Sequence, residues 1–293
     1  MVRIIQRRRG VLNYMQDSIK DNAPWAVSVT GVLLNKIYKA TGLVITRETP
    51  EKIGRDTYIE EIKKSNLNPL MKAAFITNAE KIIKEYMNQK EIVKKAIPLL
   101  TEKDKPESID EDWLMAFMDR ARLVSDSEFQ IIWAKILAEE CKEPGKISKQ
   151  LLMILSQMDR EDANAFTALC KFCVNVKTTE EPIVGQPLII IEKLNTYYVK
   201  HGITLETLRN LNAFGLIDLE EIPANCFGTE KGTIAFSVNC GNKVLAIPKE
   251  CERLRLGGVT FKKAGKELYK IVSVSPQEDF WEELALPYFE SCW

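Results

Sequence analysis

Between residues 107 and 176 the same arrangement recurs: a residue that caps helices, followed by apolar residues at helical spacing. Ser108 stands three positions before Glu111, and Ser125 stands three positions before Glu128, which is the spacing of a capping box. In that motif two side chains bond to amide groups that the first turn of a helix leaves without partners. Four amphipathic segments joined by short loops predict a compact helical bundle over residues 107–176.

The expected inward faces of the bundle carry large apolar side chains. Pro144-Gly145 separates the second helix from the third, and Asp159 predicts the N-cap of the fourth, which we expect to reach Cys173. The apolar positions of the four helices are Trp113, Phe117, Phe129, Ile132, Trp133, Ile136, Leu137, Leu151, Leu152, Leu155, Phe166, Leu169 and Cys170. This pattern predicts one shared hydrophobic core.

Residues 1–100 form an N-terminal helical region in this prediction, which Pro98 and the charged connector 101–107 separate from the bundle. Residues 24–44 are moderately apolar, so the helix expected there packs in a core or oligomer interface or, alternatively, lies on a membrane surface. Residues 56–97 predict long polar helices with one narrow apolar face. Such helices often pack against another copy of the chain or a partner.

Residues 186–293 combine helix and strand signals. Thr204 predicts the N-cap of a short helix that Gly215 closes in the left-handed conformation. The β-rich residues 233–247 predict a hairpin, and a strand followed by a helix is expected over 259–272. This order predicts a small winged-helix-like α+β domain. The expected fold is therefore mainly α: a helical arm, a central helical bundle and this C-terminal domain.

The composition is that of a soluble globular protein. Of 293 residues, 45% are hydrophobic, and 41 basic residues balance 41 acidic ones, whereas a long disordered chain has fewer apolar residues and more net charge. The apolar runs are shorter than the roughly 18 residues of a membrane span. Arg7-Arg8-Arg9 leads into polar residues, unlike a signal peptide. We expect a cytoplasmic protein with no membrane span.

Few residues suit catalysis or metal binding. His201 is the single histidine, which excludes His-rich metal centres. Cys170 and Cys173 form a Cys-x-x-Cys pair that has the spacing of half a zinc site, although cysteines more often pack as small hydrophobes. The cysteines that would complete the site are Cys226 and Cys240 or Cys251. Seven cysteines, an odd number, predict reduced thiols. We predict no catalytic residue, metal or cofactor.

Two acidic clusters leave a nuclease as the least favoured alternative. They are Asp110-Glu111-Asp112 and Glu139-Glu140, and carboxylates from separate elements hold Mg²⁺ in such enzymes. The first cluster also lies at an expected helix start, where the helix dipole favours negative charge. The sequence has no glycine-rich phosphate loop beside them.

Nucleic-acid binding is a further alternative, because the winged-helix prediction provides a candidate recognition helix. The candidate basic contacts are Arg7, Arg8, Arg9, Arg209, Lys262 and Lys263. On the expected helix, however, Glu206 offsets Arg209, which is a weak electrostatic match for a phosphate backbone. Protein contact is therefore favoured over DNA contact.

Aromatic residues near both ends of the chain are candidate interface residues, because such residues are enriched at interface hot spots. They are Trp25, Phe280, Trp281, Tyr288, Phe289 and Trp293. An equal alternative is that the C-terminal group folds back as a final helix that closes a core.

The segment 109–140 contains Trp133-Ala-Lys-Ile-Leu-Ala-Glu139, and Pro144-Gly145 follows it. Together with the closing stretch 259–269, these residues resemble the bacterial domain-of-unknown-function family numbered 2806, over about residues 107–272. The same helices resemble the abortive-infection alpha proteins more weakly. The resemblance implies a bacterial or prophage protein, with a link to phage defence, and it carries over no catalytic residues.

These observations predict a non-enzymatic protein that acts through protein–protein contacts, as a homo-oligomer or with a protein partner, in a setting such as anti-phage defence. The alternative is a nucleic-acid-binding winged-helix regulator.

Overall fold

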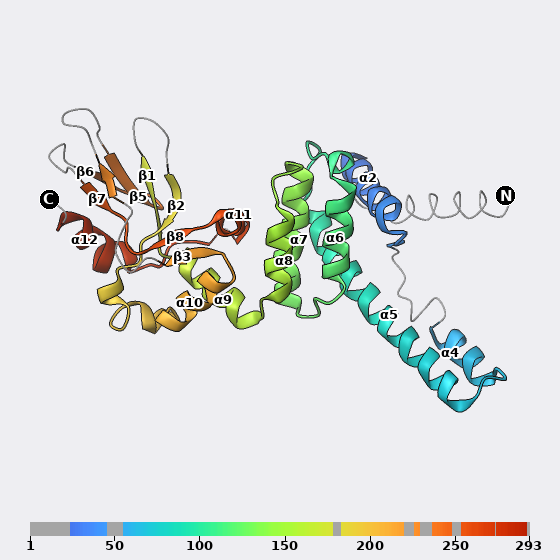
Figure 1. The fold of residues 1–293 in the computed structure, drawn as a ribbon. Helices are drawn as coiled ribbons and strands as arrows, with labels where there is room; N and C mark the ends of the chain where they lie inside the picture. The colour runs from blue at the N-terminus through green and yellow to red at the C-terminus, as the bar shows by residue number, and fades with distance from the viewer. Residues whose placement is uncertain are drawn as a thin grey trace. The chain divides into compact units, whose positions relative to one another are not determined.

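In the computed structural model, residues 24–45, 55–177, 183–219, 226–228, 236–247, 253–272 and 274–291 are described. The chain divides into two compact units, Met1–Ser156 and Gln157–Trp293. The protein is mainly helical, with a small sheet region toward the C-terminus (Figure 1). The predicted fold class is confirmed at this level.

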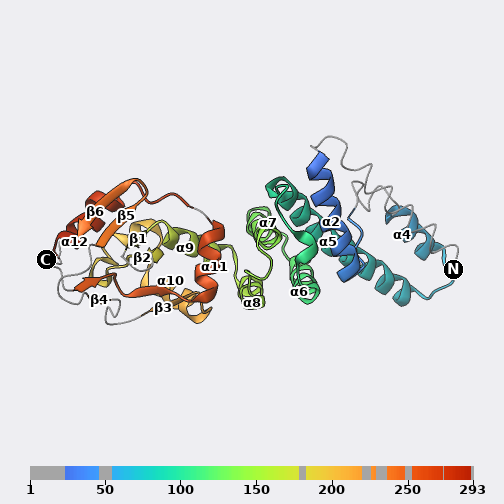
Figure 2. The same cartoon turned by 90° about the horizontal axis from the view of Figure 1, so that it is seen from above.

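Unit 1 is helical throughout its described residues. Its helices are α2 (Pro24–Thr41), α4 (Arg55–Lys64), α5 (Pro69–Ala96), α6 (Glu111–Ala121), α7 (Ser127–Lys142) and α8 (Lys149–Gln157), with short 3-10 turns at Ile97–Leu99 and Pro106–Ser108. The C-terminal part of α5 packs against α6 and α7, and α2 lies beside α6 (Figures 1 and 2). The long polar helices predicted over 56–97 are therefore present as α4 and α5.

The core of unit 1 is built around stacked aromatic side chains. The Trp113 ring stacks on Phe117, which in turn contacts Trp133, and all three side chains are buried. Trp113 Nε1 donates a hydrogen bond to the carbonyl oxygen of Ile147 at 2.8 Å, so the indole keeps a partner for its polar atom. Leu33 and Ile37 of α2 are buried as well, so this helix packs in a core. None of the described helices is long and apolar enough to cross a membrane.

The helix starts of α6 and α7 differ from the prediction. Asp110 Oδ1 accepts the Trp113 amide at 2.8 Å, and Asp126 Oδ1 accepts the Phe129 amide at 2.8 Å, so aspartates are the N-caps. Ser108 lies in the 3-10 turn that precedes α6. An aspartate reaches the same amide as a serine and adds negative charge at the positive end of the helix dipole. The capping boxes predicted from Ser108 and Ser125 were wrong, whereas the cap predicted at Asp159 is confirmed.

The two candidate caps of α6 predict different changes in stability when each is replaced by alanine. Asp110→Ala removes the bond to the Trp113 amide and should destabilise unit 1 by about 1 kcal/mol, whereas Ser108→Ala should have an effect close to zero. Urea denaturation of both variants measures the difference. Equal effects would contradict the assignment of Asp110 as the cap.

Unit 2 contains the sheet. Its elements are α9 (Arg160–Cys170), β1 (Cys173–Lys177), β2 (Ile183–Pro187), α10 (Leu205–Ala213), β3 (Ile217–Leu219), β4 (Cys226–Gly228), β5 (Phe236–Cys240), β6 (Lys243–Ile247), β7 (Arg253–Arg255), β8 (Val259–Phe261), α11 (Lys263–Val272), a π-helical segment (Trp281–Ala285) and α12 (Leu286–Glu290). Short 3-10 turns at Ile191–Lys193 and Tyr198–His201 lie between β2 and α10. Four strands form an antiparallel sheet in the order β2-β1-β5-β6, and β3–β8 and β4–β7 are separate antiparallel pairs.

Two features of unit 2 differ from the sequence prediction. The fourth helix ends at Cys170, and Cys173 begins β1, because Val174 and Val176 are buried in a strand. Helix α9 belongs to unit 2, where it packs with α10, α11 and β2, whereas the sequence prediction grouped it with the helices over 107–156. The predicted hairpin is present as β5–β6, and it joins β1 at the centre of the four-stranded sheet.

Candidate protein-interaction surface

One face of α5 runs the length of the helix with alternating steps of four and three residues. These positions, which we call the seam, are Met71, Phe75, Asn78, Ile82, Glu85, Gln89, Ile92 and Ala96. Such spacing keeps side chains in line along a helix and is the pattern of helices that pair along their length. In the C-terminal half of α5, Ile92 and Ala96 are fully buried where the helix packs against α6 and α7.

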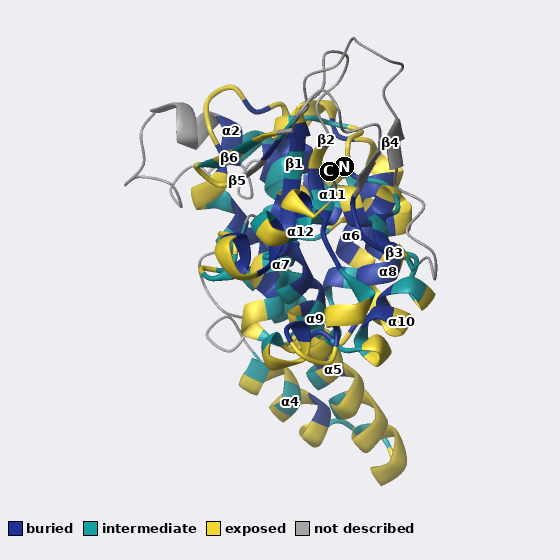
Figure 3. Ribbon diagram, turned by 90° about the vertical axis from the view of Figure 1, so that its left-hand side faces the viewer, coloured by how far each residue is buried: buried dark blue, intermediate teal, exposed yellow. Residues whose placement is uncertain are grey.

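The same face is open to solvent in the N-terminal half of α5. The exposed fractions are 43% for Met71, 44% for Phe75 and 56% for Ile82, and Asn78 between them is exposed as well. Figure 3 shows that α4 and the adjoining part of α5 are largely exposed. We call Met71, Phe75, Asn78 and Ile82 the exposed seam. Several large apolar side chains on one helix face are the usual mark of an interaction site.

Helix α4 stabilises this part of α5 from another side. Ile62 of α4 and Ala79 of α5 are both buried, and Arg55 Nη2 pairs with Glu80 Oε1 at 2.7 Å. At the N-terminus of α5, Asn68 Oδ1 accepts the Met71 amide at 2.9 Å, and a proline occupies the first helical position. Local capping and α4 packing therefore hold the helix in place while leaving the exposed seam uncovered.

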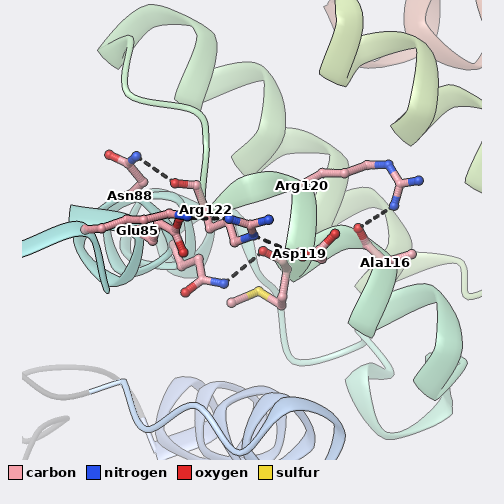
Figure 4. A network of polar contacts seen from close by, with 9 residues as sticks. Glu85, Asn88, Ala116, Asp119, Arg120 and Arg122 are labelled. Atoms are coloured by element: carbon pink, nitrogen blue, oxygen red, sulfur yellow. Dashed lines mark hydrogen bonds and ion pairs between the residues drawn. The ribbon is translucent and has the colours of Figure 1, made fainter. Parts of the chain in front are cut away.

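A polar junction marks the point where the seam passes from buried to exposed (Figure 4). Asn88 Nδ2 donates to the Arg122 carbonyl oxygen at 2.8 Å, and Gln89 Nε2 donates to the Met118 carbonyl oxygen at 2.9 Å. Because the last carbonyls of a helix have no partner within it, these two amides satisfy the C-terminal end of α6. The buried half of the seam thus ends where α6 ends.

The junction also contains an ion pair. Arg122 Nη1 lies 2.8 Å from Glu85 Oε1, and Arg122 Nε lies 3.0 Å from Asp119 Oδ1. The hydrogen bond to Asp119, with the charge of Glu85 nearby, raises the pKa of the guanidinium above its ordinary value. The guanidinium therefore stays charged and holds Glu85, the seam position next to the exposed part, against the C-terminal end of α6.

The basic residues predicted to contact nucleic acid do not form one described group. Arg7, Arg8 and Arg9 lie outside the described residues. Arg209 on α10 and Lys263 on α11 are exposed, whereas Lys262 Nζ is paired with Asp218 Oδ1 at 3.0 Å.

The aromatic residues predicted near the chain ends divide between core and undescribed positions. Phe280 and Phe289 are fully buried, Trp281 is nearly so, and Tyr288 is partly buried with its ring against Phe289. The described part of the C-terminal group thus folds back and closes the core of unit 2, the second of the two alternatives. The side chains of Trp25 and Trp293 lie outside the described residues.

The acidic residues considered for a nuclease have structural partners. Asp110 caps α6, while Asp112 and Glu111 lie exposed in its first turn. Glu140 is fully buried, and its carboxylate accepts the amides of Gly145 at 2.6 Å and Ile147 at 3.0 Å, which fixes the loop after α7. Among the residues that the structure describes, no group of three or more His, Cys, Asp or Glu side chains is arranged to hold a metal ion.

The histidine and cysteines of unit 2 lie in packed surroundings. The His201 ring contacts Phe172 and Tyr197, and its Nε2 lies 3.9 Å from Asp279 Oδ2. Burial raises the pKa of the Cys240 thiol to about 11 and also raises the pKa of Cys170 and Cys173. Thiols that stay protonated at neutral pH are weak nucleophiles. These cysteines therefore act as small core side chains.

From the sequence, the helices over residues 56–97 were expected to pack against another copy of the chain or a partner, but the exposed seam itself was not singled out. The signal was the alternation of four and three residues, which Asn78, Glu85 and Gln89 obscure because they are polar. The role of Glu85 and Gln89 as junction residues depends on where α6 ends.

Comparison with known proteins gave one match. A family described as "Protein of unknown function (DUF2806)" matches residues 77–285. This span includes Asn78 and Ile82 of the exposed seam, the polar junction and most of unit 2. Neither the curated proteins nor the solved structures gave a match.

Proposed function

The chain belongs to the DUF2806 family of proteins of unknown function, and we propose that it is a non-enzymatic protein that acts by binding a protein helix on the exposed seam of α5. The observation that carries this proposal is the exposure of Met71, Phe75 and Ile82 on a face that is buried further along the same helix. Full burial of such a side chain contributes about 1.5–3 kcal/mol. About half of each of the three side chains is still exposed, so a partner that covers them gains about half of that contribution from each.

The surroundings of the exposed seam suit a contact between helices. Lys81 is exposed on α5 beside the apolar positions, which gives the polar rim that such interfaces have. The helix is held by its N-cap and by α4, so little conformational entropy is lost when a partner binds.

A photoreactive amino acid at single positions tests this function in cells. Incorporated in place of Phe75, it should form a covalent adduct with a protein on illumination in the native host, because this side chain faces the partner. Incorporated in place of Lys84, which is exposed on α5 away from the seam, it should form far less adduct. Absence of an adduct at Phe75, or equal adducts at both positions, would contradict the proposal.

We place this activity in the cytoplasm of a bacterium, in a prophage or anti-phage defence setting. The resemblance of residues 107–272 to proteins of mobile regions, and the weaker resemblance to abortive-infection proteins, supports this setting. Phage should then form plaques less efficiently on a host that carries the parent protein than on a host that carries the Phe75→Lys variant. Equal plating of both strains by every phage of a broad panel would contradict a defence role.

A second candidate function is nucleic-acid binding by a winged-helix-like unit 2. Its support is that Arg209 on α10 and Lys263 on α11 are both exposed and that both helices pack on α9. Binding through phosphates would weaken steeply as salt rises, because counterions are released. The double variant Arg209→Ala/Lys263→Ala should lower both the affinity and the salt dependence, and unchanged values would exclude this candidate.

A further inference from the structure

This inference rests on the proposed function and names the partner that binds the exposed seam. The spacing of the seam residues on α5 indicates which helix that partner provides. We propose that the helix that binds there is α5 of a second copy of this chain, that it runs antiparallel, and that the twofold axis passes close to Asn78. Phe75 of one copy then packs against Ile82 of the other, and this contact occurs twice.

The seam is continuous with a packing surface that unit 1 already uses. Its C-terminal half is buried against α6 and α7, and its N-terminal half keeps the same four–three spacing after α6 has ended. A second helix beside the exposed seam would occupy the place along α5 that α6 leaves free. Because Phe75 and Ile82 lie at equal distances on either side of Asn78 to within one residue, the surface is self-complementary under a twofold rotation, as an isologous dimer requires.

The direction of the partner follows from what covers the rest of the seam. In a parallel pair both helices would continue together into Glu85–Ala96, where α6 and α7 of each copy already lie on that face, so the two bundles would collide. In an antiparallel pair, the C-terminal half of each α5, which α6 and α7 cover, extends away from the other copy. The polar junction at Glu85 then limits the contact at both ends.

Asn78 fits a position near the twofold axis. Its amide both donates and accepts hydrogen bonds, so two copies facing each other satisfy one another. A single asparagine in an apolar seam is a known way to fix the register of paired helices, at some cost in stability. The overlap of residues 71–85, which is centred on Asn78, is about 22 Å long at 1.5 Å per residue. This short contact predicts a reversible dimer with a dissociation constant on the order of 10 μM.

Light scattering on the full chain at about 100 μM, roughly ten times the expected dissociation constant, tests the second copy. The expected mass approaches twice the 33.4 kDa of one chain and falls toward one chain on dilution. Phe75→Lys should give a single-chain mass at all concentrations, whereas Lys84→Glu should leave the dimer intact. Because Phe75 is exposed in the single chain, circular dichroism should show both variants folded.

Pairs of cysteine variants test the direction. When Phe75→Cys and Ile82→Cys chains are mixed and oxidised, an antiparallel dimer predicts a disulfide between unlike chains, and little disulfide within either variant alone. A parallel dimer would instead link each variant to itself and would overturn the proposed arrangement. The parent chain, oxidised alongside, controls for its native cysteines.

The outcomes separate this inference from the proposed function. In the first outcome, the chain stays monomeric at 100 μM, about tenfold above the expected dissociation constant, but forms a photo-adduct at Phe75 with a different protein. This result overturns the second-copy inference and leaves the proposed function standing. A monomer with no adduct at Phe75 overturns both. A dimer whose adduct has twice the chain mass supports both.

Discussion

Replacing Phe172 with alanine is expected to destabilise unit 2 by about 3–5 kcal/mol, the usual cost of removing a buried phenylalanine. The Phe172 side chain is fully buried, and its ring lies 5.2 Å from Tyr198 and 5.3 Å from Phe280, both in edge-on contact. The residue thus joins the start of the sheet region to the C-terminal segment. Its loss opens a cavity and removes two aromatic contacts, and this cost is a large part of the roughly 5–15 kcal/mol by which a domain is usually stable.

Urea denaturation, monitored by hydrogen exchange in peptides from β1 and α12, measures the change in the free energy of unfolding of unit 2. Val199→Ala is the matched control, because Val199 belongs to the same unit and is exposed, so its effect should stay within about 0.5 kcal/mol. Similar shifts for the two variants would show that the aromatic cluster does not stabilise the unit.

Gly265→Ala is expected to cost about 3 kcal/mol or more, although alanine is the better helix former. A Cβ atom at Gly265 would overlap the Leu216 carbonyl oxygen and would lie 3.1 Å from Phe261 Cδ1. The same Leu216 oxygen accepts the Lys262 amide at 3.0 Å, so the backbone cannot move away without losing that bond. Overpacking against a fixed backbone atom is at the severe end of core substitutions.

Gly31→Ala provides the control for this prediction. Gly31 also lies within a helix, α2, but a Cβ atom there meets nothing within 4 Å. The same substitution should therefore stabilise unit 1 by about 0.5–1 kcal/mol through helix propensity. Thermal denaturation of the two variants should shift in opposite directions. A stabilised Gly265→Ala chain would refute the close approach of α11 to Leu216.

Local signals in the sequence predicted the features that depend on neighbouring residues. Thr204 caps α10 and Gly215 takes a left-handed conformation after it, as expected. The hairpin β5–β6 also follows from residues close together in the chain. Strand β1 was missed because five residues directly after a helix give little periodicity of their own. Of its two partners, β2 is close in the chain and β5 is far from it.

The exposure of the candidate site also depends on residues that are far apart in the chain, so the sequence did not predict it. That α4 and α5 are amphipathic is visible in the sequence, but exposure of Phe75 and Ile82 depends on the position at which α6 stops. Likewise, Phe280 and Phe289 have the composition of an interface as much as of a core. Their burial depends on contacts with residues such as Phe172, which are far away in the chain.

The strand order of the sheet predicts the order in which the two units fold during synthesis. The β1–β5 pairing brings together residues far apart in the chain: the Cys240 thiol donates to the Cys173 carbonyl oxygen across 67 residues. Long loops close slowly, whereas the helices of unit 1 form largely from nearby residues. Unit 1 should therefore fold on the ribosome first. Phe172 gains its ring contact with Phe280 only after the segment that contains Phe280 has been synthesised, so the core of unit 2 is completed later than that of unit 1.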